Sequence, residues 1–347
     1  MRLGALAMKK SGALPTLEEV ARLAGVGTTT VSRVINGGER VSPRTLEKVR
    51  QVIDMLGYRP NQAARVLKGA RTRTIGLIIP SIADPFFSSV AETAQAIARA
   101  NDSLLIVTAT GNDPLAVIDN LNVLVSHRVD GLLIAPASTR SQALSQLLAR
   151  IPIPVVAIDR PIHDSSVSSI LTDNFEGSRS AVQHLIGHGR RHVACLTGET
   201  TLFTIQQRIR GYRAAVAAAG LPETLNTSIR DYRSAEYAIS NLLAAPNPPD
   251  AFFTLKNSAT IYAFEVLQKL GIAIPGQVAL LGFDDFELAA TVRPTISVVR
   301  QPIEEIGRAA AELLFEQLGA GRKAARTRRI TLETQLIRRA SCGCIPA

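Results

Sequence analysis

Apolar residues recur every three or four positions after Thr16 and predict an amphipathic helix. Thr16 and Glu19 have the spacing of a capping box, and Gly25 suits the left-handed conformation that ends a helix. A second helix is expected to begin near Thr28. The apolar faces of these two helices consist of Leu17, Val20, Ala21, Ala24, Val31, Val34 and Ile35. Two short helices joined by a tight turn are typical of a helix-turn-helix unit.

The outward face of the second helix carries Thr28, Thr29 and Arg33. Hydroxyl groups near a helix N-terminus can reach bases or phosphates, and an arginine one turn later can read a guanine edge. The pattern therefore predicts that this helix reads the major groove of DNA. Two amphipathic helices joined by glycine also occur in ordinary helical bundles, and these residues alone leave that alternative open.

A third helix is predicted to begin at Ser42-Pro43, since serine is a good N-cap and proline fits the first helical position. Its buried stripe would end before Gly57. Asn61 can cap one more short helix over residues 62–68. A helix that short is marginal alone in water, so we expect it to become ordered only against a partner.

From Thr74 onward, apolar runs of strand length alternate with helical segments, and the alternation occurs twice in succession. This order predicts two doubly wound lobes, each a parallel sheet covered on both faces. Ligands in such folds bind beyond the carboxyl ends of the strands. The residues expected there are Pro80, Ser81, Asp159, Arg160, Gly198, Asn257, Asp284 and Asp285.

Composition narrows the class of protein. The chain has 347 residues and a net charge of +10, from 39 Lys and Arg against 29 Asp and Glu, which favours a polyanionic partner. Three cysteines without framework spacing favour a reducing compartment, and we expect a cytoplasmic protein. No apolar run reaches the length of a membrane span, and residues 1–7 are too short for a signal peptide. Met8 is an alternative start.

Catalytic and metal chemistry have weak support in the sequence. No nucleophile elbow, phosphate-binding loop or dinucleotide fingerprint occurs, so we expect neither an enzyme nor a cofactor. His184 and His188 have the spacing of two ligands on one helix face, but their segment is expected to be an ordinary helix end. Cys342 and Cys344 are separated by one residue, and no His or second Cys pair is expected to support a metal site there. We therefore expect no metal site.

Three stretches, EEVARLAGVGTTTVSRVIN, VSPRTLEKVRQVIDMLGYRPNQAARVLKG and TIGLIIPSIADPFF, resemble the lactose/galactose repressor (LacI/GalR) family of transcription regulators. The resemblance runs through almost the whole chain. It implies an all-α helix-turn-helix domain over 14–60, a hinge helix and linker over 61–72, and a periplasmic-binding-protein-like core for effector binding and dimerisation over 73–347. It also implies three crossings between the lobes, near residues 172, 299 and 328. Lobe one would hold 73–172 and 300–328, and lobe two 173–299 and 329–345.

The same resemblance implies the residues of both sites. Those expected to contact DNA are Thr16, Thr28, Thr29, Thr30, Ser32, Arg33, Asn36, Asn61, Ala64 and Leu67, with Leu67 inserted in the minor groove. Those expected to contact the effector are Phe86, Phe87, Asp159, Arg208, Tyr232, Asn257 and Asp284. The chain departs from the family pattern at Ser258, where a second acid is usual, and at Gly27, where Ser or Thr is usual.

The resemblance predicts a ligand-controlled DNA-binding regulator, most simply a repressor, that binds a palindromic operator as a homodimer. No leucine heptads follow the last strand, which favours a dimer over a tetramer. Carboxylates, Arg, Asn and an aromatic ring suit a sugar or sugar acid, and a purine is the alternative effector. A sugar-binding protein without a DNA role is disfavoured by the helix-turn-helix segment and by the missing export signal.

Overall fold

The computed structural model describes residues 15–35, 37, 40–59, 71–163, 165–320 and 326–344. The chain divides between Thr72 and Arg73 into two compact units. Asn36, Asn61, Ala64 and Leu67 lie outside the described residues, as does the expected hinge helix over 62–68. None of the helices in the described ranges has the length and apolar character that crossing a membrane requires.

The described residues of the N-terminal unit form three helices: α1 (Leu17–Ala24), α2 (Thr28–Ile35) and α3 (Pro43–Leu56). The predicted capping box is present, because Glu19 N donates to Thr16 Oγ1 at 3.2 Å and Thr16 N donates to Glu19 Oε2 at 3.1 Å. Gly25 ends α1 with φ of 61°. Ser42 caps α3 as expected. The helices enclose a core built on Val20, Ala21, Ala24, Val31, Val34, Val49 and Tyr58.

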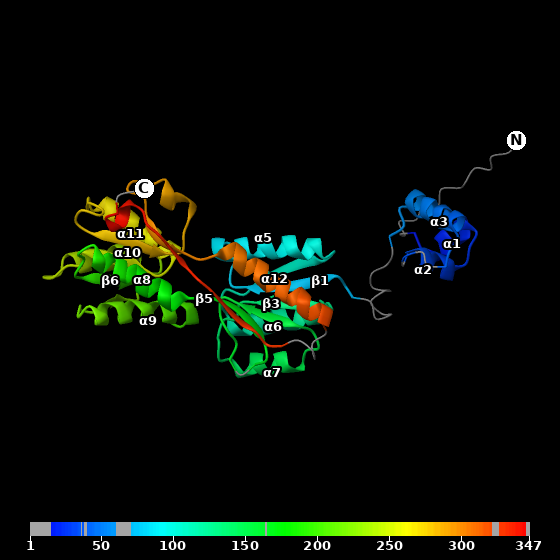
Figure 1. The fold of residues 1–347 in the computed structure, drawn as a ribbon, viewed down its shortest axis with the longest axis horizontal. Coiled ribbons are helices and arrows are strands. Elements are labelled where there is room, and N and C mark those ends of the chain that lie inside the picture. The colour runs from blue at the N-terminus through cyan, green and yellow to red at the C-terminus, as the bar shows by residue number, and fades with distance from the viewer. Residues whose placement is uncertain are drawn as a thin grey trace. The chain divides into compact units, whose positions relative to one another are not determined.

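Lobe one of the second unit is a six-stranded parallel sheet in the order β11-β5-β4-β3-β1-β2. Its strands are β1 (Thr74–Ile79), β2 (Leu104–Ala109), β3 (Gly131–Ile134), β4 (Val155–Ile158), β5 (Ser168–Thr172) and β11 (Arg329–Leu332). One face packs against α5 (Pro85–Ala100) and α12 (Ile303–Ala320), which Figure 1 shows side by side. The other face packs against α6 (Pro114–Ser126) and α7 (Gln142–Arg150).

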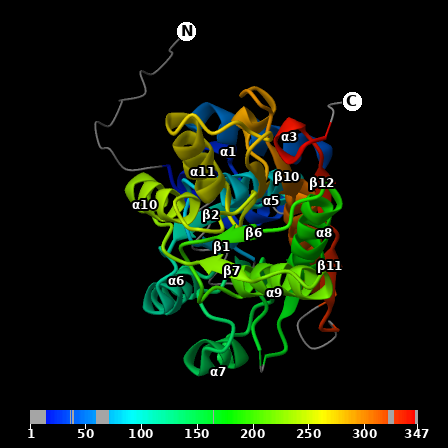
Figure 2. The ribbon, with the colours of Figure 1, turned by 90° about the vertical axis from the view of Figure 1, so that its left-hand side faces the viewer.

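Lobe two repeats this plan in the order β12-β10-β9-β8-β6-β7, with β12 antiparallel to β10. Its strands are β6 (Val193–Leu196), β7 (Thr224–Asn226), β8 (Ala251–Thr254), β9 (Ala279–Phe283), β10 (Ser297–Arg300) and β12 (Gln335–Ile337). Its helices are α8 (Asn174–Gly187), α9 (Phe203–Ala218), α10 (Tyr232–Leu243) and α11 (Asn257–Lys269), with the short 3₁₀ turns η1 (Glu287–Ala290) and η2 (Ala340–Cys342). Figure 2 views this lobe and shows α8 and α9 together on one side of the sheet.

Both sheets are buried on both faces, which explains the continuous apolar runs in the sequence. In β8, Phe252 points into the core under α10 and α11, whereas its neighbour Phe253 points into the core under α8 and α9. Both side chains are fully buried. Alternating side chains of one strand therefore serve two separate cores, as the pleat requires.

The third crossing between the lobes differs from the expected position. Residues 329–332 pair in parallel with β5 of lobe one, and Leu332 lies opposite Thr172. The chain therefore crosses between Leu332 and Gln335, not near residue 328. The segment has the sequence pattern of one strand, but its two halves complete the open edges of two different sheets. Figure 1 shows this C-terminal segment, in red, passing from one lobe to the other.

Strands β7 and β10 and helix α10 of lobe two have no counterpart in the sequence prediction. Helix α10 begins with a capping box in which Ser234 N donates to Asp231 Oδ1 at 2.8 Å. Tyr232 thus occupies the first turn of a helix.

Candidate functional site

A cavity of about 460 Å³ lies between the two lobes at the carboxyl ends of their strands. We call it the inter-lobe cavity. Its volume is within the range of small-molecule sites. The residues on its wall are Pro80, Ser81, Asp84, Phe86, Phe87, Gly111, Asn112, Asp159, Arg160, Thr197, Gly198, Glu199, Leu202, Thr204, Ile205, Arg208, Ile229, Arg230, Lys256, Ser258, Ala259, Asp284 and Gln301.

Arg208 of α9 is the centre of the lobe-two wall and is only 4% exposed. Its Nε donates to Asn174 Oδ1 at 2.7 Å, and its Nη1 donates to Leu255 O at 2.7 Å. Nη1 also donates to Asp284 Oδ2 at 3.1 Å. The guanidinium carbon lies 3.7 Å from the ring centroid of Phe283. The guanidinium is therefore held rigidly by hydrogen bonds and by a cation–π contact.

Asp284 follows β9 directly and has a φ of 72°, in the left-handed region. Gln301 Nε2 donates to its Oδ1 at 2.6 Å, and Gln301 Oε1 accepts from Thr172 Oγ1 at 2.6 Å. Thr172 precedes the first crossing and Gln301 lies in the second. The hydrogen-bond network of the cavity is thus continuous with two of the three segments that join the lobes.

Lobe one presents a matching carboxylate. Asp159 follows β4 and has a φ of 65°. Its Oδ2 accepts a hydrogen bond from Arg160 Nε at 3.0 Å. Arg160 Nη1 donates in turn to Asn112 Oδ1 at 2.7 Å and to Pro136 O at 3.1 Å. Burial raises the pKa of Asp159, and the charges of Arg160 and Arg208 oppose that shift.

The described wall carries equal numbers of opposite charges, and three of its four cations pair with a carboxylate. Besides the Arg208–Asp284 and Arg160–Asp159 pairs, Lys256 Nζ lies 3.5 Å from Asp84 Oδ2. This third pair joins lobe two to lobe one. The pKa of Glu199 is lowered by its hydrogen bonds with neighbouring threonines and by the charge of Arg230. Among the described residues, the wall therefore presents four acids (Asp84, Asp159, Glu199 and Asp284) and four bases (Arg160, Arg208, Arg230 and Lys256).

Comparison with known proteins decides the family. Residues 16–61 match "Bacterial regulatory proteins, lacI family", and residues 182–342 match "Periplasmic binding protein-like domain". The regulator CelR of Thermobifida fusca is 36% identical over 94% of this chain and 98% of its own length. The chain belongs to the lacI family of bacterial regulatory proteins. It is a DNA-binding transcriptional regulator with a ligand-binding core.

Other similar proteins agree with this assignment. The ribose operon repressor of Haemophilus influenzae is 33% identical over 88% of this chain and 92% of its own. The solved structure of a CelR–cellobiose complex has a TM-score of 0.68 at 34% identity, covering 94% of this chain and 99% of that chain. A lac repressor dimer bound to operator has a TM-score of 0.84 at 23% identity, covering 95% and 99%, and shows the shared fold.

Five of the seven residues expected at the effector site of this lacI-family protein line the inter-lobe cavity: Phe86, Phe87, Asp159, Arg208 and Asp284. The two phenylalanine rings meet edge to face, 4.9 Å apart, at the start of α5. Both are also buried in the lobe-one core, so they line the cavity and support it.

Tyr232 and Asn257 do not lie among the residues of the cavity wall, so the structure does not support placing them there. Tyr232 packs against the lobe-two core, and Lys269 Nζ lies 5.7 Å from its ring centroid. Ile229 and Arg230, which precede α10, line the cavity in its place. Asn257 Oδ1 accepts from Ser258 N at 2.7 Å, and it is Ser258 that reaches the wall.

Several charged or polar wall residues were not expected from the sequence: Asp84, Asn112, Thr197, Glu199, Thr204, Arg230, Lys256 and Gln301. Gln301 lies beside an expected crossing point, which is a signal that could have identified it. Asp285, although next to Asp284, is directed elsewhere. It pairs with Arg300 at 2.6 Å and with Arg339 at 2.9 Å and does not line the cavity.

Of the expected DNA-contacting residues, six lie in the described part of the chain, and four of these are exposed. Thr28, Thr29 and Arg33 of α2 are exposed, as is Thr16 before α1. Thr30 and Ser32 are half-buried. Val31 and Val34 on the opposite side of α2 are buried in the three-helix core, so the exposed face of α2 is the one expected from the sequence.

One premise behind the expectation of no metal site is wrong. The His184/His188 pair and the Cys342/Cys344 pair are each isolated in the sequence, but the fold brings all four side chains together. They lie outside the wall of the inter-lobe cavity.

Proposed function

We propose that this lacI-family regulator is a repressor whose operator binding is controlled by a neutral sugar in the inter-lobe cavity. The observation that carries the proposal is the balance of charge on the wall, where four acids meet four bases and three of the bases are already paired. Among the described wall residues, Arg230 is the cation outside these pairs, and it donates to Gly198 O and lies near enough to Glu199 to lower the pKa of that carboxyl. A carboxylate on the ligand would therefore add negative charge to a balanced wall, whereas sugar hydroxyls can both donate to carboxylates and accept from guanidinium groups. A neutral sugar therefore fits better than a sugar acid.

The distribution of aromatic side chains favours a sugar over a purine. Phe86 and Phe87 are the aromatic residues of the described wall, and both belong to lobe one. Lobe two contributes Leu202, Ile205 and Ile229 instead. A flat base would have a ring to stack on at one side only, whereas the C–H face of a sugar can lie on one aromatic surface while its hydroxyls meet polar groups. The relatives include a ribose operon repressor and a CelR–cellobiose complex.

A ligand in this position would contact both lobes at once. Asp159 and Asn112 approach it from lobe one, and Arg208, Asp284 and Ser258 from lobe two. A sugar that bridges them would stabilise one separation of the lobes over others. Ligand binding then shifts the population between DNA-competent and relaxed states by its difference in affinity for the two.

On the DNA side, we propose that two copies of α2 enter adjacent major-groove half-sites of a palindrome, so that the regulator acts as a homodimer. The exposed Thr28, Thr29 and Arg33 would make the contacts. Insertion of Leu67 into the minor groove remains a prediction from the family resemblance. A regulator that binds bacterial operators would work in the cytoplasm. Binding of DNA and of the effector is enough for this function, so we propose no catalytic step.

Thermal unfolding with a small panel of ligands tests the effector class. Ribose, cellobiose, their carboxylate counterparts and hypoxanthine would each be added to the full-length protein. We expect a neutral sugar to raise the Tm, because a ligand at 100 times its Kd stabilises the folded state by about 2.7 kcal/mol. The same sugar should change the affinity for DNA carrying the protein's own promoter. A shift with the carboxylates or hypoxanthine, and none with neutral sugars, would contradict the proposal.

A further inference from the structure

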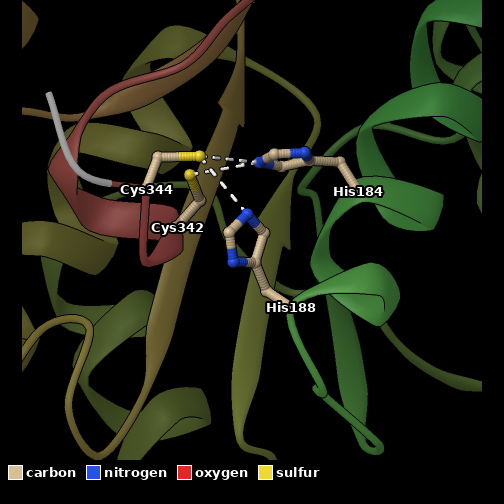
Figure 3. Close-up of side chains that lie close together, drawn as sticks. All are labelled: His184, His188, Cys342 and Cys344. Atoms are coloured by element: carbon tan, nitrogen blue, oxygen red, sulfur yellow. Dashed lines mark hydrogen bonds between the residues drawn. The ribbon is translucent and has the colours of Figure 1, made fainter. Parts of the chain in front are cut away.

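Two histidines and two cysteines face one another on lobe two (Figure 3). His184 and His188 lie one turn apart at the end of α8, and Cys342 and Cys344 flank the last turn of the chain described. His184 Nε2 lies 3.3 Å from Cys342 Sγ and 3.4 Å from Cys344 Sγ. His188 Nε2 lies 3.3 Å from Cys344 Sγ. All four potential ligand atoms lie within 4.8 Å of one another.

The three sulfur–nitrogen distances of 3.3–3.4 Å are close to those of a tetrahedral metal site. Zinc–sulfur bonds of about 2.3 Å and zinc–nitrogen bonds of about 2.0–2.1 Å, at tetrahedral angles, place sulfur and nitrogen about 3.5 Å apart. Hydrogen bonding alone explains the arrangement less well. His184 Nε2 faces two sulfur atoms, and it can make a linear hydrogen bond with only one of them at a time. A single metal ion would satisfy all four side chains together.

The cysteine turn is held in place by the protein itself. Ser297 N donates to Ser341 Oγ at 2.8 Å, and Arg339 N donates to Ser297 Oγ at 2.9 Å, which ties the turn to β10. Gly343 has a φ of 100°. One residue between two cysteines is fewer than in most zinc sites. The left-handed conformation of Gly343 lets the chain reverse there, so that both sulfur atoms face α8.

The cluster also has the chemistry and the access that a metal site needs. Cys342 is fully buried, whereas Cys344 is half-buried and His188 is exposed, so an ion can enter from the His188 side. Cysteine binds metal ions as the thiolate, and a bound zinc ion itself removes the thiol proton.

We propose that His184, His188, Cys342 and Cys344 bind one zinc ion that fastens the C-terminal turn to the end of α8. Two thiolates balance the charge of Zn²⁺, and two neutral imidazoles complete the tetrahedron. Two sulfur and two nitrogen ligands select zinc over magnesium or calcium, which prefer oxygen. Because the protein fills all four positions, the site is structural, with no open position for a reacting water. It is separate from the inter-lobe cavity and does not depend on the proposed effector.

Metal analysis of the full-length protein tests this site. The protein, carrying no histidine tag and kept reduced, would be loaded with zinc, desalted and assayed by inductively coupled plasma mass spectrometry. We expect one zinc per chain and a fall in Tm when a chelator removes it. Cobalt reconstitution should give ligand-field bands of tetrahedral Co²⁺ together with a thiolate-to-cobalt charge-transfer band.

The variants Cys344→Ser and His188→Gln should each lower the bound zinc to well below one per chain. Matched controls are Cys195→Ser, which removes the other cysteine of the chain, and His127→Gln, which alters another exposed histidine at a helix C-cap. Both controls should keep the metal. Circular dichroism checks that the variants fold. Zinc-free wild-type protein, an octahedral cobalt spectrum, or equal zinc in Cys344→Ser and Cys195→Ser would each overturn the proposal.

Discussion

Replacing Asp284 by asparagine removes the negative charge of the side chain and keeps nearly the same shape. The asparagine side chain would keep one acceptor oxygen but lose the negative charge that faces Arg208 at 3.1 Å. It would also turn its amide toward either Arg208 or Gln301, and both of these present N–H donors to Asp284. One of the two hydrogen bonds must therefore be lost or rearranged.

The cost can be estimated from burial. Removing one partner of a fully buried ion pair costs about 3–5 kcal/mol. Here the carboxylate side chain is 16% exposed and the buried guanidinium of Arg208 keeps its bonds to Asn174 and Leu255. We therefore expect a loss of about 2–3 kcal/mol in the free energy of unfolding. A carboxylate hydrogen bond to a ligand is worth about 1.5–3 kcal/mol, so sugar affinity should fall by about 10- to 150-fold.

Asp285→Asn is the matched control. Asp285 is the next residue, its side chain has the same 16% exposure, and it pairs with Arg300 and Arg339 without lining the cavity. Urea unfolding should show that both variants are destabilised. Isothermal titration with the sugar found by the thermal screen should show weaker binding for Asp284→Asn only. Equal loss of affinity in both variants would mean that Asp284 acts through stability and that its carboxylate does not contact the ligand.

Two further predictions concern the DNA-reading helix and acid stability. Arg33→Ala should weaken operator binding by about 1–3 kcal/mol in a gel-shift titration, with a smaller loss on random DNA and an unchanged Tm, and equal losses would reduce Arg33 to a phosphate contact. Burial raises the pKa of Asp285, but Arg339 and Arg300 outweigh that effect and hold the pKa below its ordinary value of 3.8. The stabilisation that the Asp285 ion pairs give is therefore present above that pH and is lost as the pH falls below it. The stability difference between wild type and Asp285→Asn should therefore shrink on acidification, and a constant difference would contradict the ion-pair assignment.

The helices of the N-terminal unit could be predicted from sequence because their signals are local. The Thr16–Glu19 box, Gly25 and the Ser42-Pro43 start all act within one helical turn, and each forms the cap that was expected. The two-lobed α/β core could also be predicted, since strands buried on both faces leave continuous apolar runs between helical segments. Strands β7 and β10 and helix α10 were missed, and Tyr232 was therefore not recognised as the first residue of a helix.

The composition of the sites depended on tertiary structure. Asp159, Arg208 and Asp284 could be predicted from strand ends and from the family resemblance. The side chains that form ion pairs and hydrogen bonds with the wall residues could not be predicted in this way. Lys256 meets Asp84 only because the lobes face each other, and Gln301 reaches Asp284 from a crossing segment.

The His184/His188 and Cys342/Cys344 pairs show the same limit most clearly. Each pair is too short a signal by itself, and more than 150 residues separate them along the chain. They meet because the C-terminal segment crosses to lobe two, adds β12 to the edge of its sheet and ends its turn beside α8. Sequence periodicity and capping report interactions over a few residues. The packing of the sheets and the path of the C-terminal segment decide which distant side chains come together, and both are visible only in the folded chain.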